Sequence, residues 1–229
     1  MIFDPVYFLF ILPGLALSFW ASMRVKRAFN KYSKVRSMRG FTGAEAAQLL
    51  LRGAGITDVK IVRSHGVLSD HYNPVTRTLA LSEPVFGSDS IAAVGVATHE
   101  AGHAIQHARH YAPLWVRSAL VPTASIGSSV GYFVMLIGLF MASTNMVLVG
   151  AVLFSAVLLF QIVTLPVEFN ASSRAKALIV EQGIVSLEER RGVDKVLNAA
   201  ALTYVAAAVS TLLTLLYFLL RSGLLGGRR

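Results

Sequence analysis

The chain has 229 residues, of which 55% are hydrophobic and only 14% are charged. Its mean hydropathy is +0.61, whereas a soluble domain of this length carries more charge and fewer apolar residues. We therefore predict a membrane protein with room for one small compact domain beside several membrane-spanning helices. The formal net charge is +9. The basic residues cluster beside apolar segments and no nucleic-acid-binding motif occurs, so the charge favours anionic lipid over nucleic acid as a partner.

Cysteine is absent from the sequence. Disulfides, thiolate metal sites and cysteine nucleophiles are therefore excluded. A metal bound by this chain must take its ligands from His, Asp and Glu, which suits zinc, manganese or iron.

The first predicted element is an apolar helix over Val6–Ser22. The preceding Met1-Ile2-Phe3-Asp4-Pro5 carries no positive charge, so we interpret this helix as an uncleaved anchor rather than a signal peptide. A basic run without any acidic residue follows the helix and favours the cytoplasmic side for the next segment. This run consists of Arg24, Lys26, Arg27, Lys31, Lys34, Arg36 and Arg39.

The segment up to about Pro122 predicts short helices and strands rather than a span. Its signals are a capping box, two runs with β propensity, turn residues between them, and a serine cap before an apolar helix. The predicted elements are a helix from Thr42-Gly43-Ala44-Glu45 to Gly53 or Gly55, strands over Val59–Val62 and Thr78–Leu81 with turns at Gly66 and Asn73-Pro74, and a helix capped by Ser88 or Ser90 that runs through His99 to about His110.

Three further apolar stretches follow, over Thr123–Ala142, Met146–Leu165 and Ala200–Leu220. None contains a charged residue, and each has the length of about 20 residues that crosses the hydrocarbon core of a bilayer. Because the chain changes side at each span, residues 166–199 are expected on the cytoplasmic side. The C-terminal Arg221, Arg228 and Arg229 are then expected outside, against the positive-inside rule.

The segment His99-Glu100-Ala101-Gly102-His103 is the motif with the clearest chemistry. Residues four apart share one face of a helix, so both imidazoles can reach one metal ion, with Glu100 close by. This is the HExxH arrangement of zinc peptidases. A structural cluster of histidines is the alternative, but the apolar helix around them disfavours a solvated face and makes an unpaired buried Glu100 costly.

A catalytic zinc site usually has three protein ligands, and Glu168 is the best candidate for the third. It follows the third span, and the even number of spans between it and His103 puts both on one membrane side. The alternative is an ordinary acidic residue in the first turn of a helix. His107 lies two helical turns from His99, about 12 Å, which is too far. The remaining candidates are Glu181, Glu188 and Glu189. The last two lie beside Arg190 and Arg191 and fit a solvated charge patch better.

Beyond these residues, the chain resembles the YugP-type bacterial membrane zinc metallopeptidases over nearly its whole length. The resemblance implies a gluzincin-like core that faces the cytoplasm, metal roles for His99, His103 and Glu168, and a catalytic role for Glu100. It is carried by the N-terminal anchor, the Asp70-His71-Tyr72-Asn73-Pro74 hairpin, the segment from His99 to His107, and the segment from Leu165 to Ser172.

The chain is more distantly similar to the HtpX and CAAX prenyl protease group. In that group, Glu-x-x-x-Asp supplies the third ligand and its support, whereas the matching last position here is Ser172. Either Asn170 or Ser172 could be the partner that supports the metal ligands.

The predicted fold is a membrane α-helical protein with about four transmembrane helices and a small α+β, zincin-like metallopeptidase core on the cytoplasmic side. The predicted segments are an anchor (1–23), a metallopeptidase region with the HExxH helix (24–122), a transmembrane hairpin (123–165), a cytoplasmic helical segment with the third ligand (166–199), and a last transmembrane helix with a short tail (200–229).

The predicted function is a zinc-dependent endopeptidase of a bacterial inner membrane, with one Zn²⁺ per chain and Glu100 as general base. The expected partners are the lipid bilayer and protein or peptide substrates in or beside the membrane, and a homo-oligomer or a membrane partner protein is left open. A catalytically idle zinc-binding scaffold is the alternative, although Glu100 argues against it. A transporter would place ionisable residues inside the spans, and these spans carry none.

Three smaller expectations concern the details of the site and the packing. Arg174, His71 or Tyr72 could donate a hydrogen bond to an oxyanion. The strand over Thr78–Leu81 could pair with an extended substrate. Gly127 and Gly131 permit close packing of helices, either within the chain or between two copies.

Overall fold

The computed structural model describes residues 4–66 and 69–225. Over these residues the protein is mostly helical, with one small sheet. Four helical stretches are long and apolar enough to cross a membrane, which confirms the prediction of about four spans. They are Pro5–Tyr32, Ala112–Phe140, Thr144–Glu181 and Leu187–Arg221. Residues 1–3 of the predicted anchor and the tail residues Arg228 and Arg229 lie outside the described residues.

The chain divides into two compact units. We call one the helical unit, which is the described part of Met1–Ala21, Trp115–Pro166 and Leu202–Arg229. We call the other the mixed unit, which is the described part of Ser22–Leu114 and Val167–Ala201. Four helices contribute residues to both units, namely α1 (Pro5–Tyr32), α5 (Ala112–Ile126), α7 (Thr144–Glu181) and α8 (Leu187–Arg221).

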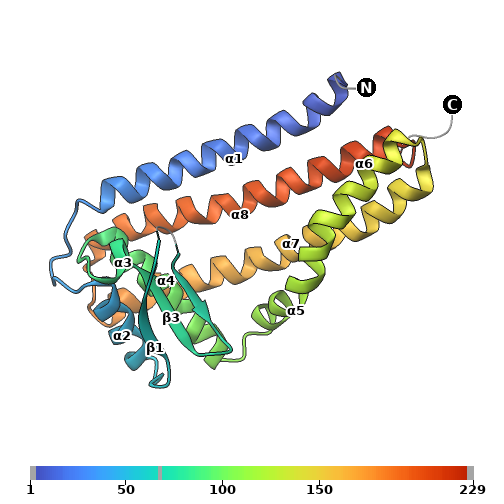
Figure 1. Ribbon diagram of the computed structural model, residues 1–229. Coiled ribbons are helices and arrows are strands. Elements are labelled where there is room, and N and C mark those ends of the chain that lie inside the picture. Colours follow the sequence, from blue (N-terminus) through green and yellow to red (C-terminus); the bar gives the residue numbers. More distant parts are fainter. Residues whose placement is uncertain (1–3, 67–68, 226–229) are drawn as a thin grey trace. The chain divides into compact units, whose positions relative to one another are not determined.

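The sheet of the mixed unit has three short strands (Figure 1). Strand β3 (Thr78–Ser82) lies between β1 (Lys60–Ser64), its parallel neighbour, and β2 (His71–Asn73), its antiparallel neighbour. The predicted strands near β1 and β3 are confirmed, and β2 completes the hairpin that the family resemblance implied. The expectation that β3 pairs with a substrate is wrong, because both of its edges are already occupied.

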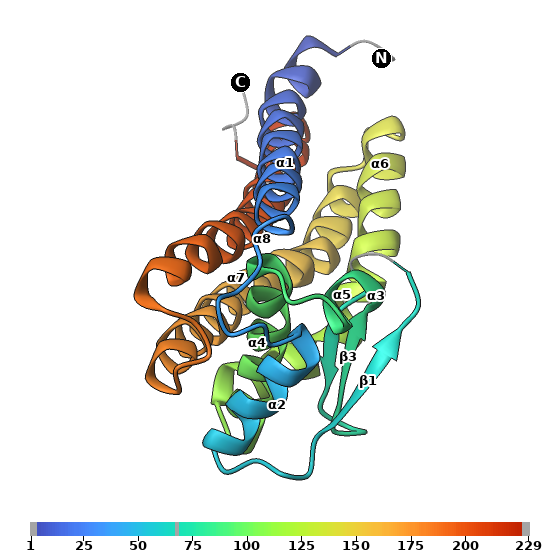
Figure 2. The ribbon, with the colours of Figure 1, turned by 90° about the vertical axis from the view of Figure 1, so that its left-hand side faces the viewer.

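Two helices of the mixed unit pack together beside the sheet (Figure 2). Helix α2 (Gly43–Gly53) begins with the predicted capping box, in which Thr42 and Glu45 exchange hydrogen bonds. Helix α4 (Ile91–Ala108) is capped by Ser90, one of the two serines predicted as its cap. The short α3 (Glu83–Phe86) connects β3 to the loop before α4. The apolar core joins the facing surfaces of these elements and includes Leu50, Leu79, Leu81, Ile91, Val94, Ile179 and Val193.

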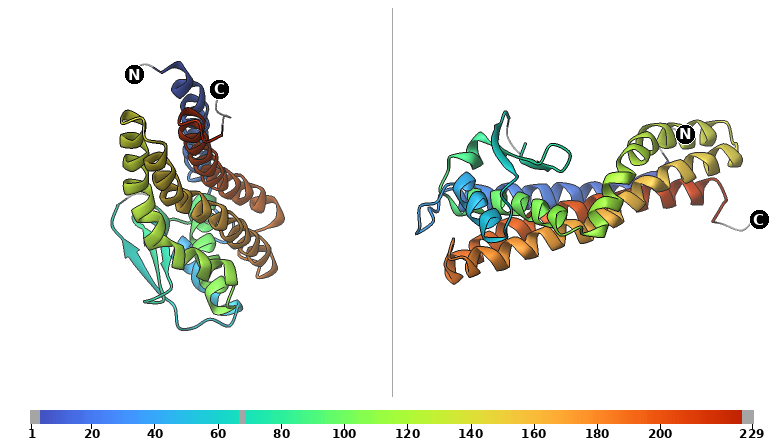
Figure 3. Two further views of the ribbon diagram at one scale, coloured as in Figure 1. Left: turned by 90° about the vertical axis from the view of Figure 1, so that its right-hand side faces the viewer. Right: turned by 90° about the horizontal axis from the view of Figure 1, so that it is seen from below.

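In the helical unit, α6 (Tyr132–Phe140) and the first part of α7 form a helical hairpin (Figure 3). One turn of π-helix, η1 (Gly127–Gly131), precedes α6. A methyl group on Gly127 would lie 2.3 Å from the carbonyl oxygen of Leu153, and one on Gly131 would lie 2.7 Å from the backbone nitrogen of Phe154. The two glycines therefore allow α7 to approach closely within one chain, which is the first of the two alternatives predicted from their spacing.

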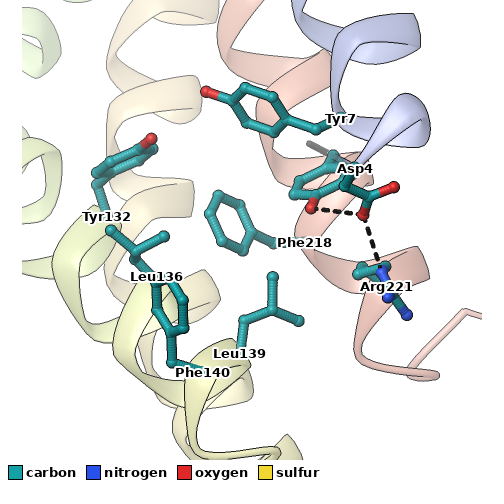
Figure 4. Close-up of a pocket in the computed structure, with 9 residues that line it drawn as sticks. Asp4, Tyr7, Tyr132, Leu136, Leu139, Phe140, Phe218 and Arg221 are labelled. Atoms are coloured by element: carbon teal, nitrogen blue, oxygen red, sulfur yellow. Dashed lines mark hydrogen bonds and ion pairs between the residues drawn. The ribbon is translucent and has the colours of Figure 1, made fainter. Parts of the chain in front are cut away.

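The helical unit also contains a polar contact between α1 and α8. The carboxylate of Asp4 accepts hydrogen bonds from the hydroxyl of Tyr217 at 3.1 Å and from Nε of Arg221 at 3.0 Å (Figure 4). These residues border a cavity of about 310 Å³ that aromatic and leucine side chains of α6 and α8 also line. The contact pairs the charges at this end of the two helices, so neither is left isolated among apolar side chains.

Candidate metal centre

Helix α4 places His99 and His103 one turn apart on the same face. Their ring centroids are 4.8 Å apart, with the rings nearly perpendicular. His103 is buried, whereas His99 and Glu100 are partly exposed. The lead-in of the helix is apolar and buried from Ile91 to Val94, which holds this face against the core of the mixed unit.

The glycine inside the motif explains how α4 meets α7. A methyl group on Gly102 would lie 2.6 Å from the carbonyl oxygen of Ala171 and 3.1 Å from its carbonyl carbon. Only a residue without a side chain permits this approach of two helix backbones. The close approach brings the two histidines to the part of α7 that carries Glu168.

Glu168 completes a group of three candidate donors. Its Oε2 atom lies 3.2 Å from Nε2 of His99 and 3.6 Å from Nε2 of His103. The three donor atoms all lie within 4.8 Å of one another, and this is the one such group in the part of the chain that the structure describes. The three residues predicted as ligands are therefore together in space.

The position of Glu168 within its helix excludes the alternative role of an acidic residue in the first turn of a helix. Helix α7 begins at Thr144 and continues without a break to Glu181. Glu168 therefore lies deep inside a helix, and the alternative of a first-turn residue stabilised by the helix dipole is wrong. Its side chain is also buried, with a relative exposure of 2% for the residue. A buried carboxylate facing two imidazoles needs a cation or a shared proton to balance it.

The orientation of the two rings fits a metal ion. Nδ1 of His99 lies 3.0 Å from Oγ of Ser172, and Nδ1 of His103 lies 3.0 Å from Oε1 of Gln106. Both Nε2 atoms consequently face Glu168. Two imidazole nitrogens and one carboxylate are a known donor set for catalytic zinc, and ligating histidines usually hydrogen-bond through the other ring nitrogen. The residues present therefore fit zinc.

The local charge favours a cation at this position. Burial by itself lowers the pKa of His103, but the nearby carboxylates of Glu168 and Glu100 outweigh it. The pKa of His103 is therefore raised above its ordinary value. The same negative potential that holds a proton on the imidazole would attract a divalent cation.

The other candidates from the sequence have different surroundings. Nδ1 of His107 lies 2.8 Å from the hydroxyl of Tyr72, away from the three donors. Nε of Arg174 donates to Oδ1 of Asn170 at 2.7 Å. Glu189 accepts hydrogen bonds from the backbone nitrogens of Met38 and Ser186. Within residues 4–66 and 69–225, none of the alternative acidic ligands joins the group of three.

The sequence analysis missed one residue of the site. Gln106 is completely buried beside His103, but the sequence analysis assigned it no role. Its i+3 spacing from His103 was the available signal, because residues three apart meet on a helix.

Two histidines four residues apart, a glutamate after the first of them and a carboxylate from a second helix are typical of zinc metallopeptidases. The chain belongs to a zinc metallopeptidase family, because the family model described as "Putative neutral zinc metallopeptidase" matches residues 7–223. It is also similar to "Putative membrane protease YugP" of Bacillus subtilis (strain 168). The two are 48% identical over 214 residues, which cover 93% of this chain and 95% of the relative. No solved structure matches the chain.

The resemblance to YugP-type proteins is thereby confirmed. The family implies zinc and peptide substrates, and the relative's name places it in a membrane. The four apolar helices of this chain agree with a membrane setting.

Proposed function

We propose that this protein is an integral-membrane zinc endopeptidase in which His99, His103 and Glu168 hold one Zn²⁺ per chain and Glu100 is the general base. The observation that supports the proposal most directly is the convergence of two Nε2 atoms and one carboxylate oxygen within 4.8 Å. Membership of a zinc metallopeptidase family supplies the reaction class.

The chemistry follows from the roles of these side chains. Zinc at such a site lowers the pKa of water toward 7 and polarises a peptide carbonyl. Glu100 is next to His99 in the sequence and partly exposed, so its carboxylate can reach solvent and substrate. It takes the proton from the attacking water and returns it to the leaving amine. His99 and His103 remain neutral ligands, while the Glu168 carboxylate reduces the net charge of the site.

The substrates that we propose are membrane proteins or their loops beside the membrane. Helix α7 carries an apolar stretch that ends at Leu165, and Glu168 follows on the same helix. A ligand so close to the end of an apolar stretch supports a reaction near the bilayer surface. The basic residues after the first span support a cytoplasmic orientation of residues 24–122 and 166–199 in a bacterial inner membrane. The segment boundaries given above remain predictions.

The first experiment measures the zinc content of detergent-purified protein. We expect one zinc per chain in the wild type, a loss in Glu168→Ala, and no change in Glu181→Ala, a control at an exposed position of the same helix. Glu100→Gln should retain zinc but lose cleavage of an unfolded protein such as casein. Zinc retained by Glu168→Ala would show that Glu168 is not a ligand. Zinc bound without any cleavage by the wild type would favour the idle scaffold.

A further inference from the structure

The side chain of Gln106 is an unusual feature of the interior of the mixed unit. It has no exposed surface, and it lies three residues after His103 on α4. A buried amide is stable only when its oxygen and its NH₂ group both have hydrogen-bond partners. The identity of those partners determines which end of the amide faces His103.

The partners of the NH₂ end come from α7. Nε2 of Gln106 donates to the carbonyl oxygen of Val167 at 2.8 Å and to Oδ1 of Asn170 at 3.0 Å. A backbone carbonyl can only accept, so this end of the amide must be the donor. The end of the Asn170 amide is fixed in turn by Nε of Arg174, which donates to Oδ1 at 2.7 Å, because a guanidinium has no acceptor.

The opposite end of the Gln106 amide therefore presents its oxygen to His103. Oε1 lies 3.0 Å from Nδ1 of that imidazole. An amide oxygen only accepts hydrogen bonds, so Nδ1 must carry the hydrogen. In a neutral imidazole the other nitrogen, Nε2, then has the free lone pair. This Nε2 is the atom that lies 3.6 Å from Oε2 of Glu168.

His99 has a less restrictive partner. Its Nδ1 lies beside the hydroxyl of Ser172, and a hydroxyl can donate or accept. The hydroxyl thus orients the ring of His99 without selecting its tautomer. Gln106 both orients the ring of His103 and selects its tautomer. Its hydrogen bond to Val167 also joins α4 to the residue that precedes Glu168.

We propose that Gln106, held by Asn170 and Arg174, is a positioning residue that keeps His103 in the tautomer with hydrogen on Nδ1 and so makes Nε2 the metal-binding nitrogen. This inference rests on the proposed function, because it takes His103 as a ligand. It assigns the support of this ligand to a series of hydrogen-bonded side chains, with Gln106 on α4 and Asn170 and Arg174 on α7. In this chain Asn170 acts through Gln106, to which it is hydrogen-bonded at 3.0 Å.

Two substitutions at one position separate positioning from packing. Gln106→Glu retains an oxygen acceptor toward Nδ1 of His103, whereas Gln106→Met retains the volume without any acceptor. We expect the zinc Kd, measured by competition with a chelator, to rise about 10- to 100-fold in Gln106→Met. It should stay much closer to the wild-type value in Gln106→Glu. A side chain that only fills space predicts the reverse order, since methionine is the better apolar filler.

A second pair tests the rest of the chain. Asn170→Asp keeps an acceptor for Gln106 and Arg174, and Asn170→Leu removes it. Only the second change should weaken zinc binding. Gln182→Ala is the matched control, because this amide also donates to a backbone carbonyl, that of Leu50, in the same unit. It should leave the zinc Kd unchanged.

A spectroscopic measurement on the zinc-loaded protein completes the test. In ¹⁵N-histidine-labelled protein with zinc bound, the hydrogen on Nδ1 of His103 should show the chemical shift of a hydrogen-bonded group in the wild type and in Gln106→Glu, because Oε1 lies 3.0 Å from Nδ1. This hydrogen-bond shift should be lost in Gln106→Met. Failure of the wild type to bind zinc would overturn the proposed function. Wild-type zinc binding with equal affinity in Gln106→Met, or an unchanged His103 spectrum in that variant, would overturn this inference. Thermal unfolding of each variant without metal shows whether it folds.

Discussion

The helical unit and the mixed unit place their apolar side chains in opposite ways. Most large apolar side chains with high exposure belong to the helical unit, such as Leu9 at 71% and Val152 at 64%. In the mixed unit, Leu50, Leu79 and Leu81 are completely buried. An apolar exterior is stable in lipid and unstable in water, whereas the mixed unit follows the pattern of a water-soluble domain. The comparison shows two folding environments within one chain of 229 residues.

Buried polar groups also differ between the two units. The mixed unit buries His103, Gln106, Glu168 and Ser172 at the candidate metal centre. In the helical unit, the hydroxyl of the buried Thr164 is satisfied locally, because it donates to the backbone carbonyl of Phe160 at 2.7 Å. A metal site would explain why the mixed unit buries this cluster of polar side chains.

The largest effect should come from closing the helix contact in the mixed unit. Gly102→Ala would place a methyl group 2.6 Å from the backbone oxygen of Ala171, which must push α4 away from α7. We expect a loss of about 1–3 kcal/mol in stability and a sharp rise in the zinc Kd. Gly95→Ala on the same helix is the control, because the nearest atom to its methyl group would be Cγ1 of the Val193 side chain at 3.3 Å, with the Val193 backbone at 3.8 Å. Equal zinc binding by the two variants would contradict the role of Gly102.

The same kind of change in the helical unit should leave the metal centre intact. Gly131→Ala would place a methyl group 2.7 Å from the backbone nitrogen of Phe154. Thermal unfolding in detergent should show a loss of about 1–3 kcal/mol, while the zinc Kd stays unchanged. The exposed neighbour Val130→Ala is the control for stability. A change in zinc affinity for Gly131→Ala would show that the two units are not independent.

A smaller effect is expected at the start of α2. Thr42→Ala removes the hydroxyl that accepts from the backbone nitrogen of Glu45 at 3.3 Å, and should cost about 1 kcal/mol in unfolding experiments. Thr76→Ala, in an exposed turn, should cost much less. Zinc content should be unaffected in both variants. No difference between the two melting temperatures would contradict the role of the cap.

The capping box also predicts a pH dependence. Hydrogen bonds from the backbone nitrogen and hydroxyl of Thr42 lower the pKa of Glu45 below its ordinary value of 4.5. A carboxyl whose pKa is lowered on folding stabilises the protein above its unfolded pKa, and this contribution is lost as the pH falls through the folded pKa. The difference in stability between wild type and Thr42→Ala should therefore narrow as the pH falls below about 4.5. A constant difference across that range would contradict it.

The smallest effect is expected beside the metal centre. Tyr72→Phe removes the hydroxyl that bonds to His107 at 2.8 Å and should cost about 0.5 kcal/mol. Because His107 lies outside the group of three donors, the zinc content should not change. Reduced zinc content in this variant would indicate that His107 is a zinc ligand.

Elements with local signals could be predicted from the sequence. The cap residues at Thr42 and Ser90 set the starts of α2 and α4, and the HExxH spacing put two candidate ligands on one helix. The end of α7 could not be predicted, since the apolar pattern stops at Leu165 while the helix continues through Pro166 to Glu181. The three-residue strand β2 is too short for a period-2 pattern.

Contacts between distant segments were also beyond the sequence. The role of Gln106 depends on Val167 and Asn170, more than sixty residues further along the chain. The approach of Gly102 to Ala171 depends on the same pairing of α4 with α7. Neither contact leaves a pattern within α4 alone that shows which residue it meets.

The separation of the donors along the chain has a consequence for biosynthesis. Helix α4 is synthesised first, and the ribosome must then complete a long apolar hairpin before α7 supplies Glu168 and Ser172, which lies 73 positions after its partner His99. A nascent chain that ends before α7 contains two imidazoles but neither the carboxylate nor the backbone against which Gly102 packs. If the three residues bind a metal as proposed, the complete centre can form only after the hairpin has been made. A chain terminated between the two helices would lack it.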